Sequence, residues 1–344
     1  MEVLHLFYVE SNFHLILAEN FINDIGIEVS DVLFVTHRGV QLPSIYRDRL
    51  LYDGTLSQFR QRVQLYRENR NYYKGLLKRK KVISYSPFQF LFPAIRFFSE
   101  YHLIEEGFSA YGVLSDIDNS RALRYELFKA LYINLAFPFV SRNIKGFLMG
   151  ISFSSKKTTR PTKLLVSNVN AYDNYCWGKW VEKQIVPIRG VMKGSIIGQN
   201  ILVMDRLSKK GRPFDDNVYL CVLKDVINTL GLDKQVLLVK LHPADLASEN
   251  NVKSRLSSWF HDIGIMPNYI NDNLEELALS NNNNTFIGTN STSLYYAPIF
   301  GRTNKAISFA RLLANEDKQY ALFLERWGGT ETFCDLFSKE VKCL

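Results

Sequence analysis

Two adjacent carboxylates, Glu105 and Glu106, follow the apolar run 101–104 and precede Gly107. A carboxylate serves as a general base near neutral pH when partial burial or a neighbouring like charge raises its pKa. An acidic pair at the end of a buried segment offers both conditions, and Gly107 permits a sharp exit of the chain. Alternatively, the two acids meet solvent or cap a following helix. The pair therefore indicates either a base or a cap.

A histidine occupies a similar place later in the chain. His242-Pro243 follows the run 235–241, which is apolar but for Lys240. Side chains alternate along a strand, so Lys240 and His242 are expected on one face. The unperturbed pKa of histidine is about 6.5, close to the second ionisation of a phosphate monoester. His242 is thus a candidate to bind or protonate a phosphate leaving group, and a hydrogen-bonded structural histidine is the alternative.

The third group is rich in hydroxyl side chains. Asn290, Ser291, Thr292 and Ser293 follow the apolar run 285–288 and open a predicted helix. Free backbone N–H groups and the positive end of the helix dipole favour an anion at such a place, and the hydroxyls add donors. An ordinary N-cap accounts for the same residues. The segment therefore predicts an anion site or a cap.

These groups need elements that position them, and apolar runs alternate with segments of helical spacing along the chain. The first half is predicted to hold strands and helices in alternation, with strands at 3–9, 32–36, 82–85, 101–104 and 163–168, helices at 13–22 and 56–70, and an aromatic connector or helix at 88–100. The second half is more regular, with strands at 201–204, 235–241, 266–270, 285–288 and 305–309, and helices at 216–230, 252–260, 273–280 and from 291. Such alternation favours parallel, doubly wound sheets, because each crossover covers one face.

A chain of 344 residues with 47% hydrophobic content is expected to form two domains. The sequence predicts an α/β fold with two Rossmann-like doubly wound domains, residues 1–195 and 196–344, and the last helix as a candidate to pack back on the first. Ligands of such sheets bind beyond the carboxyl ends of the strands, where all three groups fall. The acid then belongs to the first domain, and the histidine and hydroxyl cluster belong to the second. This division suits a cleft between two domains.

The net charge of +8 implies attraction to anions, which include nucleic acid, lipid headgroups, sugar nucleotides and acidic glycans. The basic residues from Arg60 to Lys81 indicate a solvated face or a dock for an anionic glycan. No recognisable nucleic-acid-binding module is present in the sequence, so no nucleic-acid partner is expected.

The four cysteines, Cys176, Cys221, Cys334 and Cys343, form no CxxC pair and no metal-ligand spacing. Neither a zinc site nor a disulfide scaffold is indicated, and a reducing compartment is expected. The N-terminus lacks the basic start and long apolar run of a signal peptide. No window approaches the roughly 18 apolar residues of a membrane span. We expect a cytoplasmic location, with any membrane contact peripheral on the inner membrane.

A metal-dependent reaction is not expected. Asp116-Ile117-Asp118 formally fits an Asp-x-Asp metal motif, but its surroundings are more typical of a helix entry. The sequence has no G-x-x-x-x-G-K-[ST] and no G-x-G-x-x-G, so P-loop and dinucleotide sites lack support.

Taken together, the three groups resemble those of the bacterial GT-B sialyltransferases, above all glycosyltransferase family 52, and of the related capsular polysialyltransferases of family 38. These families carry an acidic-acidic-Gly motif, a His-Pro motif and a Ser-Ser/Thr motif in this order. Here they look like 105–107, 242–243 and 291–293. The opening segment 7–23 is also similar to the family 52 start. The resemblance spans most of the chain and implies the GT-B fold.

The resemblance implies an inverting sialyltransferase that displaces CMP from CMP-sialic acid without metal or cofactor. It implies Glu105 as the general base on the acceptor hydroxyl, with Glu106 as the fallback, and His242 on the departing phosphate. The remaining donor-binding set is Gly107, Pro243, Asn290, Ser291, Thr292 and Ser293. The implied acceptor is a glycan or glycolipid, as in lipooligosaccharide or capsule. Candidates to touch it lie at the ends of the first two strands: Ser11, Asn12, His37 and Arg38.

Two other functions fit the same residues. Transfer of another CMP-activated ulosonic acid such as Kdo is the nearest, because capsule Kdo transferases also use acid and His-Pro elements. The other is a non-catalytic glycan-binding protein that uses the basic face 60–81.

Overall fold

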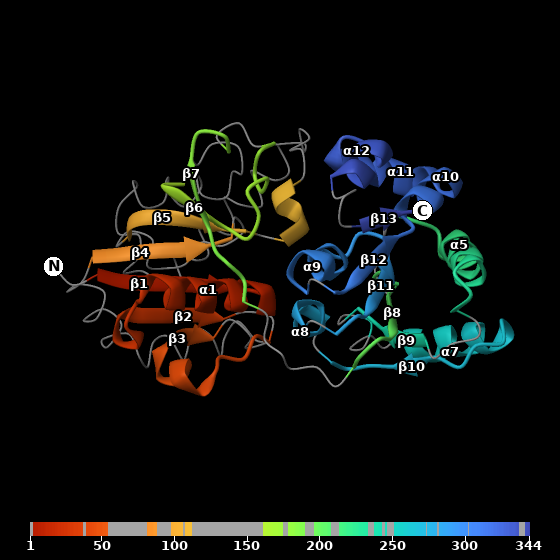
Figure 1. The fold of residues 1–344 in the computed structure, drawn as a ribbon, viewed down its shortest axis with the longest axis horizontal. Coiled ribbons are helices and arrows are strands. Elements are labelled where there is room, and N and C mark those ends of the chain that lie inside the picture. Colours follow the sequence, from red (N-terminus) through yellow and green to blue (C-terminus); the bar gives the residue numbers. More distant parts are fainter. Residues whose placement is uncertain are drawn as a thin grey trace, which may run out of the picture. The chain divides into compact units, whose positions relative to one another are not determined.

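The protein is described by a computed structural model of the full chain (Figure 1). It divides into two compact units, Met1–Ile188 and Arg189–Leu344. The residues that the structure describes are 3–36, 39–53, 81–87, 98–105, 107–111, 161–174, 178–189, 196–207, 213–232, 237–242, 245, 251–272, 274–280, 282–301, 303–336 and 341–344.

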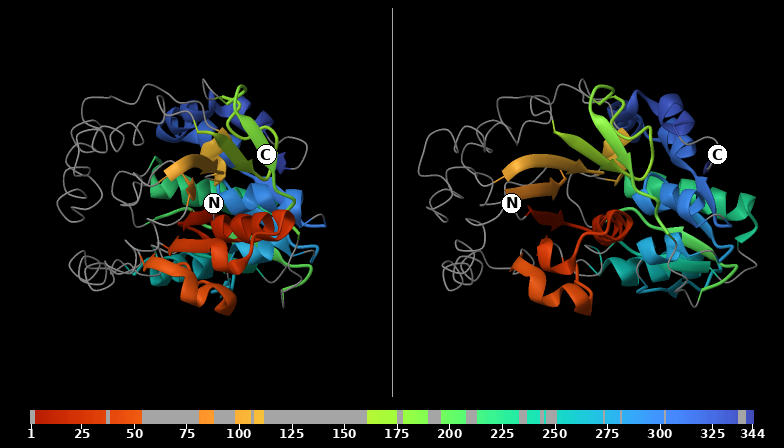
Figure 2. Two further views of the ribbon diagram at one scale, coloured as in Figure 1. Left: turned by 90° about the vertical axis from the view of Figure 1, so that its left-hand side faces the viewer. Right: turned by 60° about the vertical axis from the view of Figure 1, so that its left-hand side comes forward.

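The first unit is built on a parallel sheet of seven strands in the order β3-β2-β1-β4-β5-β6-β7. Its strands are β1 Val3–Val9, β2 Val32–Thr36, β3 Leu50–Asp53, β4 Lys81–Ser86, β5 Phe98–Ile104, β6 Lys163–Val166 and β7 Glu182–Ile185. The helical elements described here are α1 Asn12–Ile25, η1 Val29–Asp31, η2 Ser44–Arg49 and η4 Gly107–Tyr111. Two further views show α1 beside this sheet (Figure 2).

The sequence explains why β1 and α1 form where they do. Residues of β1 and β2 are apolar on both faces, as a parallel strand covered on both sides requires. The Ser11 side chain caps α1 by accepting from the His14 N–H, and Gly26 ends it at a φ of 69°, which favours glycine. Phe21 of α1 then meets Phe7 of β1 edge-on at 6.2 Å between ring centroids.

The second unit holds a parallel sheet of six strands in the order β10-β9-β8-β11-β12-β13. Its strands are β8 Asn200–Val203, β9 Leu237–Lys240, β10 Asn268–Tyr269, β11 Thr285–Gly288, β12 Lys305–Ser308 and β13 Val341–Cys343. Its described helices are α5 Asp216–Thr229, α7 Val252–Asp262, α8 Leu274–Leu279, α9 Thr292–Phe300, α10 Ala310–Glu316, α11 Lys318–Leu324, η6 Glu325–Trp327 and α12 Thr330–Asp335. In Figure 1, α8 and α9 lie on one side of this sheet, and α5 and α7 on the other.

Both units share one strand order. Numbered within its unit, each sheet begins 3-2-1-4-5-6, the order of a Rossmann fold. The predicted α/β class with two Rossmann-like parallel domains is therefore confirmed. In this order the chain reverses direction across the sheet between the first and fourth strands, and ligands bind in the crevice at that point. The two reversal points are β1/β4 in the first unit and β8/β11 in the second.

Some elements differ from the sequence prediction. β5 begins at Phe98, so residues 98–100 of the expected connector are strand. The prediction omitted three strands, β3, β7 and β13, and it named a last helix without bounds, where the structure has three helices, α10, α11 and α12. The predicted helix at 56–70, residues 88–97, the motif Asp116-Ile117-Asp118, and the basic run before Lys81 lie outside the described residues.

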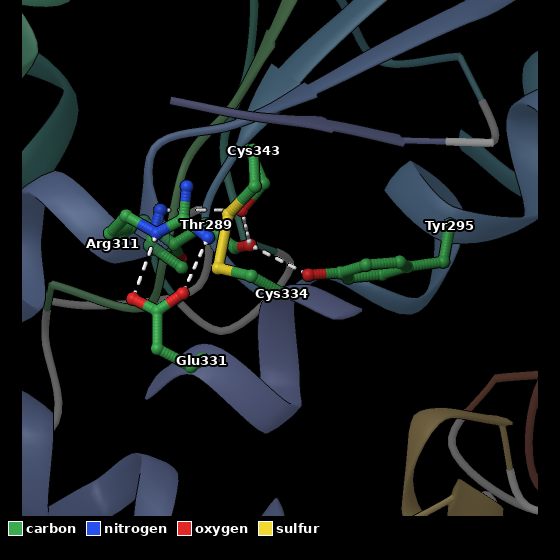
Figure 3. Close-up of a disulfide and its surroundings, with 8 residues drawn as sticks. Thr289, Tyr295, Arg311, Glu331, Cys334 and Cys343 are labelled. Carbon is green, nitrogen blue, oxygen red and sulfur yellow. Dashed lines mark hydrogen bonds and ion pairs between the residues drawn. A yellow bond between two sulfur atoms is a disulfide. The ribbon is translucent and has the colours of Figure 1, made fainter. Parts of the chain in front are cut away.

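The expectation that the cysteines form no disulfide is wrong. Cys334 of α12 and Cys343 of β13 are bonded, with Cα atoms 5.9 Å apart (Figure 3). The helices α10, α11 and α12 follow β12 in the sequence, and β13 then returns to pair with β12. This return brings Cys343 close to Cys334. Within the described ranges, no helix is long and apolar enough to cross a membrane.

Candidate functional site

Glu105 follows β5 directly and is fully buried, with 0% of its surface exposed. Its Oε1 accepts a hydrogen bond from the Tyr111 hydroxyl at 2.8 Å. Its Oε2 accepts two more, from the backbone N–H of Ser167 at 2.6 Å and from the Ser167 hydroxyl at 2.7 Å. These hydrogen bonds fix the orientation of the carboxylate.

The chain around Glu105 is equally constrained. Gly107 takes a φ of 64°, so the sharp exit expected after the acidic pair is present. Tyr172 lies in the loop after β6 at a φ of 65°, unusual for a residue other than glycine, and its hydroxyl donates to the Ile104 carbonyl at 2.8 Å. These contacts tie the ends of β5 and β6 together around Glu105. Glu106 lies outside the described residues.

The reversal point of the first unit holds two of the four predicted acceptor residues. Ser11 and Asn12 follow β1, and the Ser11 hydroxyl accepts from the His14 N–H at 3.3 Å. The buried Glu10 beside them accepts from the Tyr8 hydroxyl at 3.3 Å. His37 and Arg38 lie outside the described residues.

The reversal point of the second unit is closely packed. Gly288, the last residue of β11, has no room for a larger side chain, because a Cβ there would lie 2.9 Å from the Val203 carbonyl oxygen of β8. The two strands that flank the crevice therefore end in close contact. We call residues 288–293, which leave β11 and enter α9, the anion loop.

Thr289 anchors the anion loop. It is buried, at 1% exposed, and its hydroxyl donates to the carboxylate of Asp205, the second residue after β8. The Thr289 carbonyl accepts from the Ser308 hydroxyl at 2.7 Å and from the Tyr295 hydroxyl at 3.3 Å. Three elements, β8, β12 and α9, thus hold one residue of the loop.

Burial raises the pKa of Asp205 to about 6, against an ordinary value of 3.8. Hydrogen bonds from Thr289 and Tyr219 act in the opposite direction, and the nearby Asp245 adds to the rise. Sequence reasoning missed Asp205, although it immediately follows the run 201–204, just as the predicted residues follow their runs. Asp205 is partly exposed, and an acid with a perturbed pKa at a ligand crevice is typical of functional sites.

The predicted hydroxyl cluster opens α9 as expected. Ser291 is the N-cap residue, yet its side chain makes no capping hydrogen bond. Asn290, Ser291 and Thr292 are partly exposed, whereas Ser293 is buried at 4% exposed. The first turn of a nine-residue helix therefore presents its positive dipole end without a capping side chain from Ser291. This arrangement suits a bound anion.

His242 lies just after β9, as predicted, and is exposed. Desolvation by the surrounding protein lowers the pKa of His242, while Asp245 raises it and Arg206 lowers it further. The carbonyl of His242 accepts from the Asp245 N–H at 2.8 Å, and the Asp245 carboxylate accepts from the Leu207 N–H at 2.8 Å. Asp245, which sequence reasoning also missed, thus ties the end of β9 to the segment after β8. Pro243 lies outside the described residues.

The strand order places His242, Asp205 and the anion loop at the same end of the second sheet. β8 lies between β9 and β11, so His242 and the anion loop emerge on either side of Asp205. Strands are spaced about 4.8 Å apart, which puts the ends of β9 and β11 roughly 10 Å from each other.

No cluster of metal-ligating side chains occurs within the described part of the chain.

No protein-family model matches the sequence, and no curated protein matches it. Among solved structures, the chain is similar to a sialyltransferase from Photobacterium damsela at 13% identity and a TM-score of 0.47, covering 100% of this chain and 81% of that one. It is similar to a 2,6-sialyltransferase from a Photobacterium species, solved with CMP and lactose, at 10% identity and a TM-score of 0.49, covering 99% and 78%. It is also similar to Anabaena HepE, solved with UDP, at 7% identity and a TM-score of 0.43, covering 90% and 80%.

Proposed function

We propose that the protein is a glycosyltransferase whose second unit binds the nucleotide of an activated sugar at the β8/β11 reversal point. The observation that carries the proposal is the anion loop: a helix start without a capping side chain from Ser291, locked by Thr289 and facing the crevice where a Rossmann-like sheet binds its ligand. His242, two strands away, adds a titratable donor to the same edge.

The charges assign the two ends of the nucleotide. A phosphate belongs at the start of α9, because the helix dipole and backbone N–H groups favour negative charge there. Asp205 would repel that phosphate, so we place the nucleoside on its side of the crevice, where hydroxyl or amino groups could donate to the carboxylate that also accepts from Thr289. His242 completes the phosphate site: a bound phosphate dianion favours its protonated form, which neutralises the leaving group. The reaction on this proposal needs no metal and no cofactor besides the donor.

We propose Glu106, rather than Glu105, as the general base. The Glu105 carboxylate is buried and accepts hydrogen bonds from Tyr111 and Ser167 among the described residues, so it does not reach an acceptor hydroxyl without breaking them. A base must approach the proton that it removes to within hydrogen-bond distance. Glu105 is on this proposal a positioning residue that fixes the end of β5, and its neighbour carries the proton transfer.

The proposed donor is CMP-sialic acid and the proposed reaction is inverting transfer to a glycan hydroxyl, with cytoplasmic location and peripheral membrane contact. The three motifs support this choice through the resemblance to families 52 and 38. On the same grounds we propose the GT-B arrangement of the two units. An oxocarbenium-like centre that bears its own carboxylate asks the protein mainly to activate the acceptor and neutralise the phosphate.

Release of CMP from CMP-sialic acid, with and without a galactoside acceptor, tests the function. We expect acceptor-dependent release in the wild-type chain and a loss of at least about 100-fold in Glu106→Gln and in His242→Ala. His261→Ala is the matched control, because His261 is an exposed histidine of α7 in the same unit. Glu105→Gln should lower the unfolding temperature as well as the rate.

The outcomes separate the alternatives. Release only from CMP-Kdo replaces sialic acid by another ulosonic acid and keeps the site. Glycan binding without release from any CMP-ulosonate refutes the enzyme and favours a binding protein. Full turnover in Glu106→Gln, with turnover lost in a stably folded Glu105→Gln, returns the base role to Glu105.

A further inference from the structure

Two cysteines near the C-terminus are bonded to each other, and both belong to elements that support the anion loop. Cys334 of α12 and Cys343 of β13 are nine residues apart in sequence, and their Cα atoms are 5.9 Å apart (Figure 3). Disulfides require roughly 4.4–6.8 Å between Cα atoms, so the backbone holds both sulfurs within bonding reach. Cys334 is buried at 6% exposed, whereas Cys343 is partly exposed. Cys343 is therefore the more accessible residue of the pair.

The Cys334 side of the bond reaches the anion loop through two aromatic rings. Phe333, next to Cys334 in α12, is fully buried and meets Tyr295 of α9 edge-on, with ring centroids 5.8 Å apart. The hydroxyl of Tyr295 donates to the Thr289 carbonyl at 3.3 Å. A shift of α12 thus bears on the contact that orients Thr289. Figure 3 shows the Tyr295 ring beside the disulfide, with its hydroxyl directed to Thr289.

Cys343 is connected to the Thr289 carbonyl through its neighbouring strand in the sheet. Cys343 pairs with Ser308 of β12, and the Leu344 N–H donates to the Ser308 carbonyl at 2.8 Å. The Ser308 hydroxyl donates to the Thr289 carbonyl at 2.7 Å. β13 is a three-residue edge strand that pairs with β12, at the short end of ordinary strand lengths, so a link to α12 adds a restraint to the few hydrogen bonds of its ladder. The disulfide supplies that restraint.

We infer that Cys334 and Cys343 form a reversible thiol–disulfide modification site that sets how firmly the anion loop is held and how tightly it binds phosphate. The co-reactant is a low-molecular-weight disulfide of the glutathione class. The Cys343 thiolate attacks one sulfur of it, forming a mixed disulfide and expelling one glutathione thiolate. The Cys334 thiolate then attacks the Cys343 Sγ and expels the second. In total the protein gives up two electrons and two protons, which reduce the glutathione disulfide to two thiols. A dithiol reductant reverses the exchange.

The affinity part of this inference rests on the proposed function, so two measurements on the full chain are needed. Titration calorimetry with CMP, in dithiothreitol and after glutathione disulfide treatment, measures the affinity. We expect the oxidised form to bind CMP about fivefold more tightly or better. Hydrogen exchange of peptides covering 285–293 and 341–344, without nucleotide, measures the order of the loop and of β13. We expect slower exchange in the oxidised form.

The cysteine variants locate the effect. Cys334→Ser and Cys343→Ser should lose the response to oxidation in both measurements. Cys221→Ser is the matched control and should keep it, because Cys221 is an exposed free cysteine on α5. Counting free thiols before and after oxidation should show a fall of two in the wild-type chain and in Cys221→Ser.

Several outcomes overturn the inference. A thiol count that does not fall under oxidant shows that the pair does not form. Exchange of 285–293 that is equal in both redox states, despite a fall of two thiols, refutes the coupling to the loop. CMP affinity that is equal in both states refutes the control of binding. Redox-dependent exchange in a chain that binds no CMP in either state keeps the modification site and instead refutes the proposed nucleotide site.

Discussion

Replacing Asp205 with asparagine is expected to stabilise the second unit at neutral pH. Burial raises the pKa of Asp205 from 3.8 to about 6, a difference of roughly two units. Each unit corresponds to about 1.4 kcal/mol, so the ionised carboxylate costs the folded state about 3 kcal/mol above pH 6. Asparagine has the same shape and its amide oxygen still accepts from the Thr289 hydroxyl. We expect Asp205→Asn to gain about 1–3 kcal/mol at pH 7.5.

The pH dependence gives the sign of the effect. Between pH 6 and pH 4 the folded chain binds the extra proton at Asp205 and the unfolded chain does not, so the contribution of Asp205 to wild-type stability rises as the pH falls through this window. The gain from Asp205→Asn should shrink accordingly and vanish near pH 4. Urea unfolding by circular dichroism at pH 7.5, 6 and 4.5 measures it, with hydrogen exchange of residues 200–207 assigning the transition to the second unit.

Asp225→Asn is the matched control, because Asp225 is an exposed aspartate on α5 of the same unit. It should change stability by less than about 0.5 kcal/mol at every pH. A loss of stability in Asp205→Asn at pH 7.5, or a gain of the same size at pH 4.5, refutes the reasoning from burial. In either case the carboxylate would be better paired in the folded chain than its contacts to Thr289 and Tyr219 indicate.

Binding of CMP should take up a proton at His242, because a bound phosphate raises the lowered pKa of the free ring. The affinity for CMP should then fall as the pH rises. Calorimetry in two buffers should show proton uptake in the wild-type chain and none in His242→Ala. Gly288→Ala should cost about 1–3 kcal/mol, since its Cβ would crowd the Val203 carbonyl at 2.9 Å, and a thermal melt that matches wild type contradicts this. Arg311→Ala should cost less than about 1 kcal/mol despite the 2.7 Å ion pair with Glu331, because that pair is solvent-exposed; a larger loss in urea unfolding counts against it.

The strands that sequence reasoning located best are those buried on both faces. The bounds predicted for β1, β2 and β11 match the structure, because a parallel strand covered by helices must be apolar along its whole length. The edge strands β7 and β13 were missed for the opposite reason. Glu182–Ile185 mixes charged and apolar residues with no buried position, and Val341–Cys343 contains an exposed lysine. Such segments become strands only because a neighbour offers its unpaired backbone.

The strand-end positions of the candidate residues were easier to predict than their burial and contacts. His242 and Ser291 lie at strand ends because an apolar run that stops abruptly marks where a parallel strand leaves the sheet. The burial of Glu105 depends on Ser167, 62 residues later, and on a loop whose Tyr172 has an unusual backbone angle. Neither is visible in the local sequence around the acidic pair. Position follows from periodicity, whereas protonation and access follow from tertiary contacts.

The disulfide between Cys334 and Cys343 could not be predicted from the local sequence either. Cys334 and Cys343 are nine residues apart, a spacing that matches no disulfide or metal motif. They meet because β13 returns to pair with β12 after the chain has formed α12; the prediction had no strand there and gave the last helix no bounds. An edge strand this short gains little from its own hydrogen bonds, so a covalent link there changes the order of the C-terminus more than it would in a central strand. Since Ser308 of β12 also donates to the Thr289 carbonyl, the order of the C-terminus and the geometry of the anion loop are linked through one hydroxyl group.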